Sequence, residues 1–171
     1  MHLNQHLPPG SKVLSIGDAE MFEARFPVAY NTVFDHSLFE EWLGADAPAG
    51  ADGFPDHALR PFQSVDELRQ ALADRGITHL YVNWLEILRY RSPGNYGYTA
   101  FVSPGRFVQL RELGILDEPW RIETAVMPLE ALDPGRREIV REWGDEPTLT
   151  RQGQQFLKTF EVFPVRRDTP R

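Results

Sequence analysis

Cysteine is absent from this 171-residue chain. The absence excludes disulfide bonds, thiolate nucleophiles and metal sites built on cysteine. No apolar run approaches the roughly 18 residues that a membrane-spanning helix needs, and residues 1–12 lack the basic and apolar regions of a secretory signal peptide. We therefore expect a soluble polypeptide that carries no transmembrane segment and no export signal.

Positive charge is also scarce. The chain has 18 Lys and Arg against 25 Asp and Glu, which gives a formal net charge of −7. A nucleic-acid-binding face needs a basic surplus, so we predict no nucleic-acid partner. Hydrophobic residues make up 42% of the chain and include 11 Phe, which is enough for a packed core. This length suits one globular domain over residues 1–171.

The clearest structural signal is the stretch SVDELRQALADRGITHLYVN at residues 64–83. Ser64 and Glu67 have the spacing of a capping box, and the apolar residues that follow Ser64 fall on one helix face. Gly76 ends the predicted helix, and the apolar run after it suits a buried strand. A helix that leads directly into such a strand is typical of α/β folds.

The rest of the chain predicts more alternating elements. Strands are expected over 12–16 and 28–34. A helix is expected after each strand, over 19–26 and over 35–43, with Asp35 as the N-cap of the second helix. Further helices are expected over 84–91, 104–113 and 134–143. A short strand is expected just before residue 128, and a longer one over 156–165, where Pro164 indicates a sheet edge.

These elements predict an α/β fold, a three-layer Rossmann-like sandwich. Its sheet would be mainly parallel, with about four or five strands and a C-terminal edge strand. Residues 44–61 are rich in Ala, Gly, Asp and Pro and predict a flexible loop. Residues 3–7 have the pattern of a helix end before Pro8, so residues 1–9 are either the tail of a preceding helix or a frayed terminal turn.

The predicted strand, turn and helix over 13–22 occupy the place where a Rossmann-type fold holds a nucleotide. This segment has one glycine where the dinucleotide fingerprint needs three, and its acidic residues would repel phosphate. A histidine or asparagine on the strand after Gly76 could line the same crevice, or could simply hydrogen-bond the backbone. The residues of this alternative crevice are Gly17, Asp18, Asp35, His79 and Asn83.

The densest set of metal-ligating side chains is Asp35, His36, Glu40 and Glu41. His36 and Glu40 lie one helical turn apart, but the sequence offers no third and fourth ligand at a recognisable spacing. We interpret this set as a solvated acidic helix face, and we predict no metal and no cofactor.

The segment 84–98 mixes aromatic residues with arginine and asparagine. Arginine can fork onto phosphate, and tyrosine can stack on a sugar ring. This is the best candidate surface for a sugar, a phosphate or a peptide, although a loop that packs back onto the sheet would have the same composition. Its candidate residues are Glu86, Arg89, Tyr90, Arg91, Asn95, Tyr96 and Tyr98.

Two stretches of the chain, residues 8–37 and 75–98, together resemble a known family. They contain PP-x-x-K-V-L at 8–14, V-x-Y-x-T-x-F-D at 28–35 and GITHLYVNW at 76–84, followed by Glu86, Arg89 and Tyr90. This pattern resembles the soluble C-terminal tail of large bacterial membrane glycosyltransferases of the dolichyl-phosphate-mannose mannosyltransferase-like and aminoarabinose-transferase-like superfamily. The resemblance covers residues 3–98.

The resemblance implies a polytopic enzyme that takes a sugar from a polyprenyl-phosphate carrier. The acidic catalytic residues of such enzymes lie between early membrane spans, so none of them maps onto this chain. The expected function is a non-catalytic extracytoplasmic accessory domain for acceptor or partner recognition. Its partner would be a glycan, a polyprenyl-phosphate sugar or the membrane-embedded portion of the same polypeptide. The implied location is periplasmic or otherwise extracytoplasmic within a membrane protein, and cytoplasmic for a free protein.

Two alternative functions stay open. The first is a small Rossmann-like enzyme or nucleotide-binding protein that works at the alternative crevice. The second is a protein–protein interaction module that dimerises through an exposed sheet edge or an aromatic patch.

Overall fold

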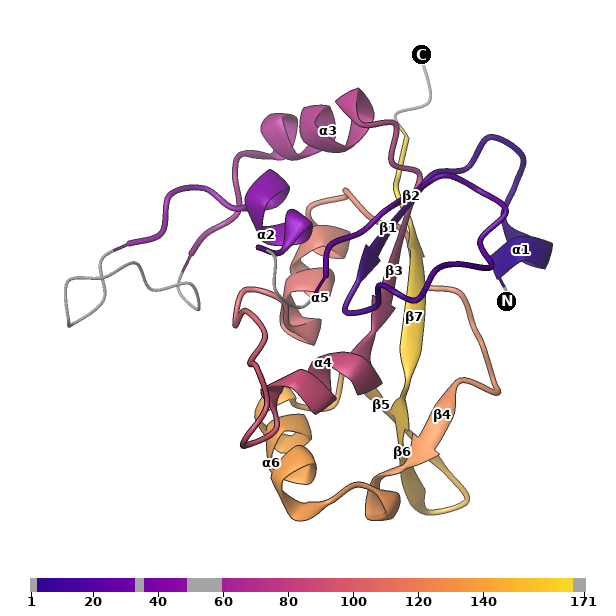
Figure 1. The fold of residues 1–171 in the computed structure, drawn as a ribbon, viewed down its shortest axis with the longest axis vertical. Helices are drawn as coiled ribbons and strands as arrows, with labels where there is room; N and C mark the ends of the chain where they lie inside the picture. The colour runs from indigo at the N-terminus through magenta and orange to yellow at the C-terminus, as the bar shows by residue number, and fades with distance from the viewer. Residues whose placement is uncertain (1–2, 33–35, 49–59, 168–171) are drawn as a thin grey trace.

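The computed structural model describes residues 3–32, 36–48 and 60–167 (Figure 1). It has a mixed α/β fold with a four-stranded sheet in the order β2-β1-β3-β7 and a three-stranded sheet in the order β4-β6-β5. In the larger sheet, β1 (Val13–Ile16) is parallel to β2 (Val28–Ala29) and to β3 (His79–Asn83). At one edge, β7 (Phe160–Pro164) is antiparallel to β3. The predicted mainly parallel sheet with a C-terminal edge strand is therefore confirmed, whereas the second sheet is an addition to it.

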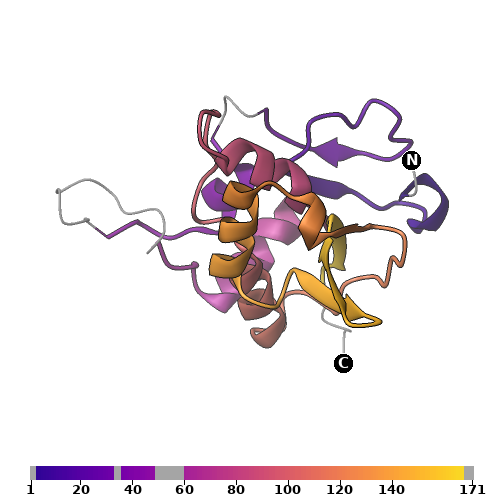
Figure 2. The same ribbon diagram turned by 90° about the horizontal axis from the view of Figure 1, so that it is seen from below.

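The two faces of the larger sheet are covered differently. Helices α2 (Leu38–Leu43), α3 (Val65–Asp74) and α5 (Pro104–Glu112) pack on one face and contribute buried side chains to the main hydrophobic cluster there. Figures 1 and 2 both place these helices on the same side of the strands. The short α1 (Leu3–His6) and the loop 17–27 cover the other face, where a second cluster contains Leu3 and Met21.

The helix and strand predicted over 64–83 are confirmed as α3 and β3. The Ser64 side chain accepts a hydrogen bond from the Glu67 backbone N–H, and the Glu67 carboxylate accepts one from the Ser64 N–H at 2.9 Å. This reciprocal pair is the capping box. Gly76 has a φ of 65°, which favours glycine and turns the chain from the helix into the strand.

The helix predicted over 19–26 is wrong, because this segment is a loop. Asp18 Oδ1 accepts a hydrogen bond from the Glu20 N–H at 2.8 Å, a local turn that competes with helix formation. Met21 is buried while the neighbouring Phe22 is 89% exposed, so the segment has no continuous apolar face. The opening β–α–β–α pattern therefore lacks its first helix.

The next elements differ from their predicted bounds. The strand expected over 28–34 is shortened to β2 in the part of the chain that the structure describes. Ser37 occupies the N-cap of α2, and Asp35, the expected N-cap, lies outside the described residues. Residues 49–59 of the expected flexible loop also lie outside them, but Gly44 and Phe62 at its ends meet in an isolated β-bridge.

The predicted strand over 156–165 is two strands that belong to different sheets. It divides at Thr159 into β6 (Gln154–Lys158) and β7. A hairpin joins β6 to β5 (Thr148–Arg151) through Gln152 and Gly153, whose φ angles of 50° and 80° suit a two-residue turn. The smaller sheet is completed by β4 (Val126–Pro128), which precedes the 3-10 helix η1 (Leu129–Ala131).

Helices α4 (Trp84–Arg91) and α6 (Pro134–Trp143) have the predicted bounds. Pro164 lies in the edge strand as expected, and the segment 115–120 covers that edge by donating from the Asp117 N–H to the Pro164 carbonyl. No helix within the described ranges is long and apolar enough to cross a membrane.

Candidate functional site

The strand order creates a switch point between β1 and β3. The connection from β1 to β2 passes over the face that holds Met21, and the connection from β2 to β3 passes over the opposite face through α2 and α3. Ligands of open parallel sheets bind outside the carboxyl ends of the strands at the point where connections leave in opposite directions. Here Gly17 follows β1 and Asn83 ends β3 at that point.

At this point the structure brings together residues from the two predicted sets. We define the switch-point site as Gly17, Asp18, Asn83, Glu86, Arg89, Tyr90 and Tyr98. The Asn83 amide donates from Nδ2 to Asp18 Oδ2 at 3.2 Å, and the Gly17 N–H donates to Tyr98 Oη at 3.1 Å. The alternative crevice and the 84–98 surface therefore share one end of the sheet.

Gly17 allows α4 to approach the end of β1 closely. Its φ of 81° lies in the left-handed region that favours glycine. A Cβ atom at this position would lie 2.6 Å from Ile87 Cγ1 and 2.9 Å from the Asn83 carbonyl oxygen. The glycine thus sets the distance between the two halves of the site.

Acidic and amide groups already occupy the N-terminus of α4. The Asn83 side chain accepts a hydrogen bond from the Glu86 N–H at 3.1 Å, and the Glu86 carboxylate lies in the first helical turn. Arg89 is bound to this carboxylate, with Nε 2.8 Å from Oε2. A phosphate would have to displace these partners, so the site favours neutral hydroxyl groups over anions.

Two tyrosines form the aromatic part of the site. The rings of Tyr90 and Tyr98 are stacked, with centroids 6.3 Å apart and an interplanar angle of 20°. The guanidinium of Arg89 lies 4.6 Å from the Tyr90 centroid and donates to the Tyr90 hydroxyl at 2.7 Å. Burial raises the pKa of Tyr90 and of Tyr98. A tyrosine hydroxyl is both a hydrogen-bond donor and an acceptor, so each can donate to a ligand.

Two residues of this region were not identified from the sequence. Ser15 donates from Oγ to the Asp18 carbonyl at 2.7 Å, and Tyr81 Oη lies 3.5 Å from Asp18 Oδ2. Strand alternation is the signal that would have found Tyr81, because residues 81 and 83 point to the same face of β3. Burial, followed by the nearby Asp18 carboxylate, strongly raises the pKa of Tyr81.

The raised pKa of Tyr81 predicts a loss of stability in alkali. The unfolded chain releases the tyrosine proton near pH 10, while the folded chain holds it, so stability is complete below that pH and falls as the pH rises further. One tyrosine contributes at most about 1.4 kcal/mol per pH unit. Urea unfolding of the wild type and of Tyr81→Phe between pH 9 and about 11 checks this. The variant should show the shallower decline, and an identical slope would contradict the assignment.

His79 and Asp35 do not join the site. His79 lies at the opposite end of β3, where its ring packs edge-on against Trp120 at 5.4 Å and its Nδ1 lies 2.8 Å from Thr78 Oγ1. Burial, with a smaller contribution from Arg167, lowers the pKa of His79. Asp35 lies outside the described residues. Gly17, Asp18 and Asn83 are thus the part of the alternative crevice that the structure brings together.

Three residues of the 84–98 surface have local roles or lie at its margin. Arg91 donates to the carbonyls of Thr99 and Val102, and its guanidinium lies 5.5 Å from the Trp143 ring centroid, so it holds the loop to the core. Asn95 donates to the Ser92 carbonyl at 3.4 Å within a turn. Tyr96 is 74% exposed.

The predicted acidic face of α2 is interrupted by Glu40, which is buried. Its carboxylate accepts hydrogen bonds from Arg60 at 3.2 Å and from Thr99 Oγ1 at 2.5 Å, which joins α2 to two loops. His36 and Glu41 are exposed. Within residues 3–32, 36–48 and 60–167, no three histidine, aspartate or glutamate side chains gather as metal ligands.

The switch-point site can therefore hold a ligand by hydrogen bonds and ring stacking. Asp18 and Glu86 supply carboxylate acceptors, Asn83 supplies an amide, and the tyrosines supply hydroxyl donors beside flat apolar faces. These groups suit a ligand that carries several hydroxyls. No family model, curated protein or solved structure matches this chain.

Proposed function

We propose that this domain is a non-catalytic recognition module that binds a sugar. The observation that carries the proposal is the convergence of Asp18, Asn83 and Glu86 with Tyr90 and Tyr98 at the switch point. A sugar presents hydroxyls at its rim and an apolar C–H face, and this combination of carboxylates, amide and tyrosine rings complements both.

We also propose that the larger sheet is an abbreviated Rossmann-like, doubly wound sheet. The order β2-β1-β3 and the placement of successive connections on opposite faces support this interpretation. In it, the loop 17–27 takes the place of the first crossover helix. The single glycine after β1 and the acidic groups nearby make nucleotide binding the weaker alternative.

We further propose that the module is the extracytoplasmic accessory domain of a lipid-linked-sugar glycosyltransferase, acting in acceptor or partner recognition. The sequence resemblance over residues 3–98 supports this context. An antibody to the domain, applied to soluble and membrane fractions of the native cells, tests it. A membrane band several times larger than 19.6 kDa is the expected result, and a soluble band near 19.6 kDa would contradict it.

The binding part of the proposal is tested by nuclear magnetic resonance titration with methyl mannoside, and with mannose 1-phosphate as the anionic comparison that should bind more weakly. We expect shifts in the amides of Gly17 and Asn83 and in the ring signals of Tyr90 and Tyr98. Replacing Asp18 with asparagine should weaken binding about tenfold, because a charged hydrogen-bond acceptor becomes neutral. The matched control is Asp74→Asn on the exposed end of α3, which should leave the affinity unchanged.

Two outcomes would contradict sugar binding at this site. The first is that sugars leave the Gly17, Asn83 and tyrosine signals unmoved at millimolar concentration. The second is that a nucleotide, and no sugar, raises the melting temperature, because a ligand that binds only the folded state stabilises it. That second result would favour the nucleotide-binding alternative.

A further inference from the structure

A separate pocket of about 500 Å³ lies beside the outer edge of β7. We name the segment 118–125 the arch, since it leaves that edge and returns to the chain beside β6. The arch is tied down at one side by the Trp120 N–H, which donates to the Val162 carbonyl at 2.9 Å. At the other side the Thr159 N–H donates to the Ala125 carbonyl at 2.8 Å. Between these two hydrogen bonds the arch has the four residues 121–124, whereas β7 has only Phe160 and Glu161. The longer segment must therefore bulge away from the strand.

The register of β7 directs backbone groups of Phe160 toward this space. The carbonyls of Val162 and Pro164 accept hydrogen bonds on the outer edge, from Trp120 and Asp117. Backbone groups of alternate residues point to the same edge of a strand, so those of Phe160 point outward as well. A polar group of a ligand can therefore reach the strand under the arch.

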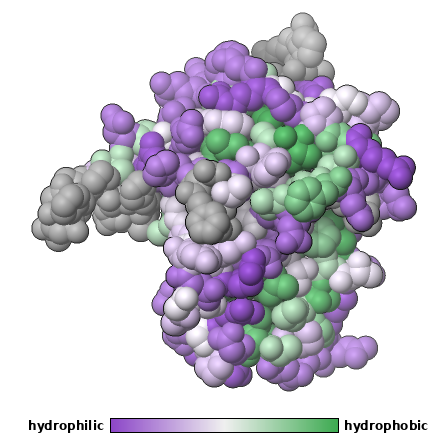
Figure 3. Space-filling view, in the orientation of Figure 1, coloured by the Kyte–Doolittle hydropathy of each residue, from purple (hydrophilic) through white to green (hydrophobic). Residues whose placement is uncertain are grey.

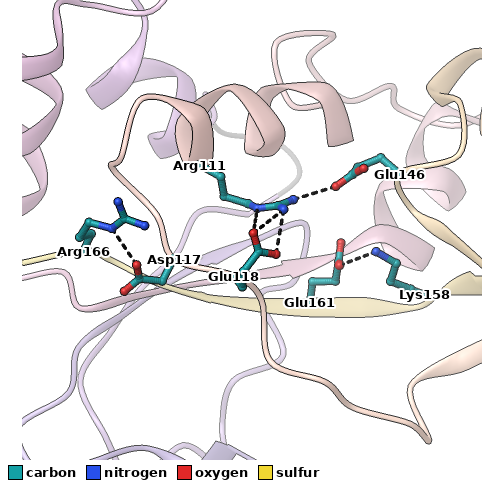
Figure 4. Close-up of polar contacts among 7 residues, drawn as sticks. All are labelled: Arg111, Asp117, Glu118, Glu146, Lys158, Glu161 and Arg166. Atoms are coloured by element: carbon teal, nitrogen blue, oxygen red, sulfur yellow. Dashed lines mark hydrogen bonds and ion pairs between the residues drawn. The ribbon is translucent and has the colours of Figure 1, made fainter.

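Ion pairs hold the start of the arch in place. Arg111 of α5 binds the Glu118 carboxylate through Nη2 at 2.7 Å and the Glu146 carboxylate through Nη1 at 2.8 Å (Figure 4). Arg166 holds Asp117, the residue before the arch, at 2.8 Å. Farther along, Arg151 Nη1 donates to the Glu123 carbonyl at 3.1 Å. These anchors make the pocket largely pre-formed, as small-molecule sites usually are.

The apolar walls of the pocket include two aromatic rings that the second hydrophobic cluster supports. Trp120 packs against His79 and Phe160 against Tyr81, each with ring centroids 5.4 Å apart. Ile122, Ala125 and Leu149 add aliphatic surface. Figure 3 shows hydrophobic side chains reaching the surface between hydrophilic ones over the lower part of the molecule, where β4, β6 and β7 lie in Figure 1. A flat apolar group would find rigid partners here.

Three cations and three carboxylates line the pocket, so the lining has no net charge, but two of the carboxylates are already bound. Glu118 is bound by Arg111, which it shares with Glu146, and the buried Glu161 accepts hydrogen bonds from Lys158 Nζ at 2.9 Å and from Trp84 Nε1 at 2.8 Å. Outside these ion pairs, the lining has two arginines, Arg121 and Arg151, and one carboxylate, Glu123. Lys158 has two further N–H groups that can donate to a ligand.

We propose that this pocket binds a small aromatic anion, of the aryl carboxylate class. The ring lies against Trp120 and Phe160, and the carboxylate takes charge-assisted hydrogen bonds from Arg151 and Lys158. This pocket lies beyond β7, whereas the switch-point site lies at the carboxyl ends of β1 and β3, and its ligand class does not rest on the sugar recognition proposed there.

Titration with 2-naphthoate, followed by nuclear magnetic resonance on the full chain, tests the proposal. We expect shifts in the Trp120 indole N–H and in the amides of Ala125 and Phe160. The neutral isostere 2-naphthamide should bind about tenfold more weakly, because it lacks the charge. Arg151→Gln should weaken 2-naphthoate about tenfold and 2-naphthamide by less, because both ligands lose the Arg151–Glu123 anchor of the arch but only the anion loses the charged partner. The matched control is Arg141→Gln on α6, whose side chain is 71% exposed, and it should change neither affinity.

Three results would overturn the proposal. The first is that millimolar 2-naphthoate shifts none of the signals of Trp120, Ala125 and Phe160. The second is that 2-naphthoate and 2-naphthamide bind with equal affinity. The third is that Arg151→Gln lowers the affinity for both ligands by the same factor. The amide spectrum of each variant shows whether it is folded. If Arg151→Gln does not fold, Arg121→Gln takes its place, and it too should lower the affinity for 2-naphthoate more than the affinity for 2-naphthamide.

Discussion

Replacing Gly17 with alanine is expected to lower the free energy of unfolding by about 3–4 kcal/mol. Two costs add at this position. The φ of 81° strains any residue that has a Cβ atom. The new methyl group would also lie 2.6 Å from Ile87 Cγ1 and 2.9 Å from the Asn83 carbonyl oxygen, so that α4 would have to move. Equilibrium unfolding in urea measures the loss.

Gly10→Ala is the matched control for this substitution. Gly10 has a φ of 79°, nearly the same as that of Gly17, but nothing lies within 4 Å of its Cβ position. This variant should lose only about 1–2 kcal/mol, the cost of the backbone conformation. The difference between the two variants isolates the close approach of α4. Equal losses would show that α4 does not depend on a bare backbone at residue 17.

Phe39→Ala is expected to lower the free energy of unfolding by about 4 kcal/mol. Phe39 is 0% exposed, and its ring stacks on Phe107 with centroids 5.1 Å apart. It also contacts the rings of Phe62 and Phe101, so truncation removes one member of each of three ring pairs. Because α2 has only six residues, packing rather than helix propensity holds it in place.

The same substitution at Phe22 provides the control. Phe22 is 89% exposed, so Phe22→Ala should change the free energy of unfolding by no more than about 0.5 kcal/mol. Urea unfolding of both variants under the same conditions makes the comparison. A small loss for Phe39→Ala, close to that of Phe22→Ala, would mean that the main hydrophobic cluster does not hold α2.

The sequence predicts elements well where local chemistry decides them. Helix α3 has its capping box in the sequence, α6 starts with Asp133 and Pro134, and α4 starts at Asn83. These signals lie within a few residues of the helix ends that they determine. The mainly parallel sheet was also predictable, because strands and helices alternate through the middle of the chain.

The errors arise where distant contacts decide the structure. In the loop 17–27, Asn4 of α1 donates to the Glu23 carbonyl at 2.7 Å and accepts from the Arg25 N–H at 2.8 Å, which satisfies backbone groups without a helix. Thr159 divides the last predicted strand because its backbone pairs with residues outside both sheets' ladders. Its N–H donates to the Ala125 carbonyl, and its carbonyl accepts from the Leu85 N–H. No pattern near Asn4 or Thr159 reveals these partners.

Most residues of the candidate site were named from the sequence, but their arrangement was not. The two predicted sets appeared separate because local sequence patterns do not specify which strands are neighbours in the sheet. Only the pairing of β1 with β3 brings Asp18 next to Asn83. For the same reason His79, at the start of β3, looked equivalent to Asn83 at its end. The pocket under the arch escaped prediction altogether, since segments 118–125 and 149–161 carry no shared motif.

The position of β7 also determines when the molecule can fold during its synthesis. Its partner β3 is made much earlier, yet β7 is the last of the described strands to leave the ribosome. Until then β3 has one unpaired edge and the core lacks Val162 and Phe163. Unpaired edges recruit other chains, so the nascent polypeptide passes through an aggregation-prone interval that ends only as β7 emerges. Slow translation just before Phe160 would lengthen that interval and raise the demand for chaperones.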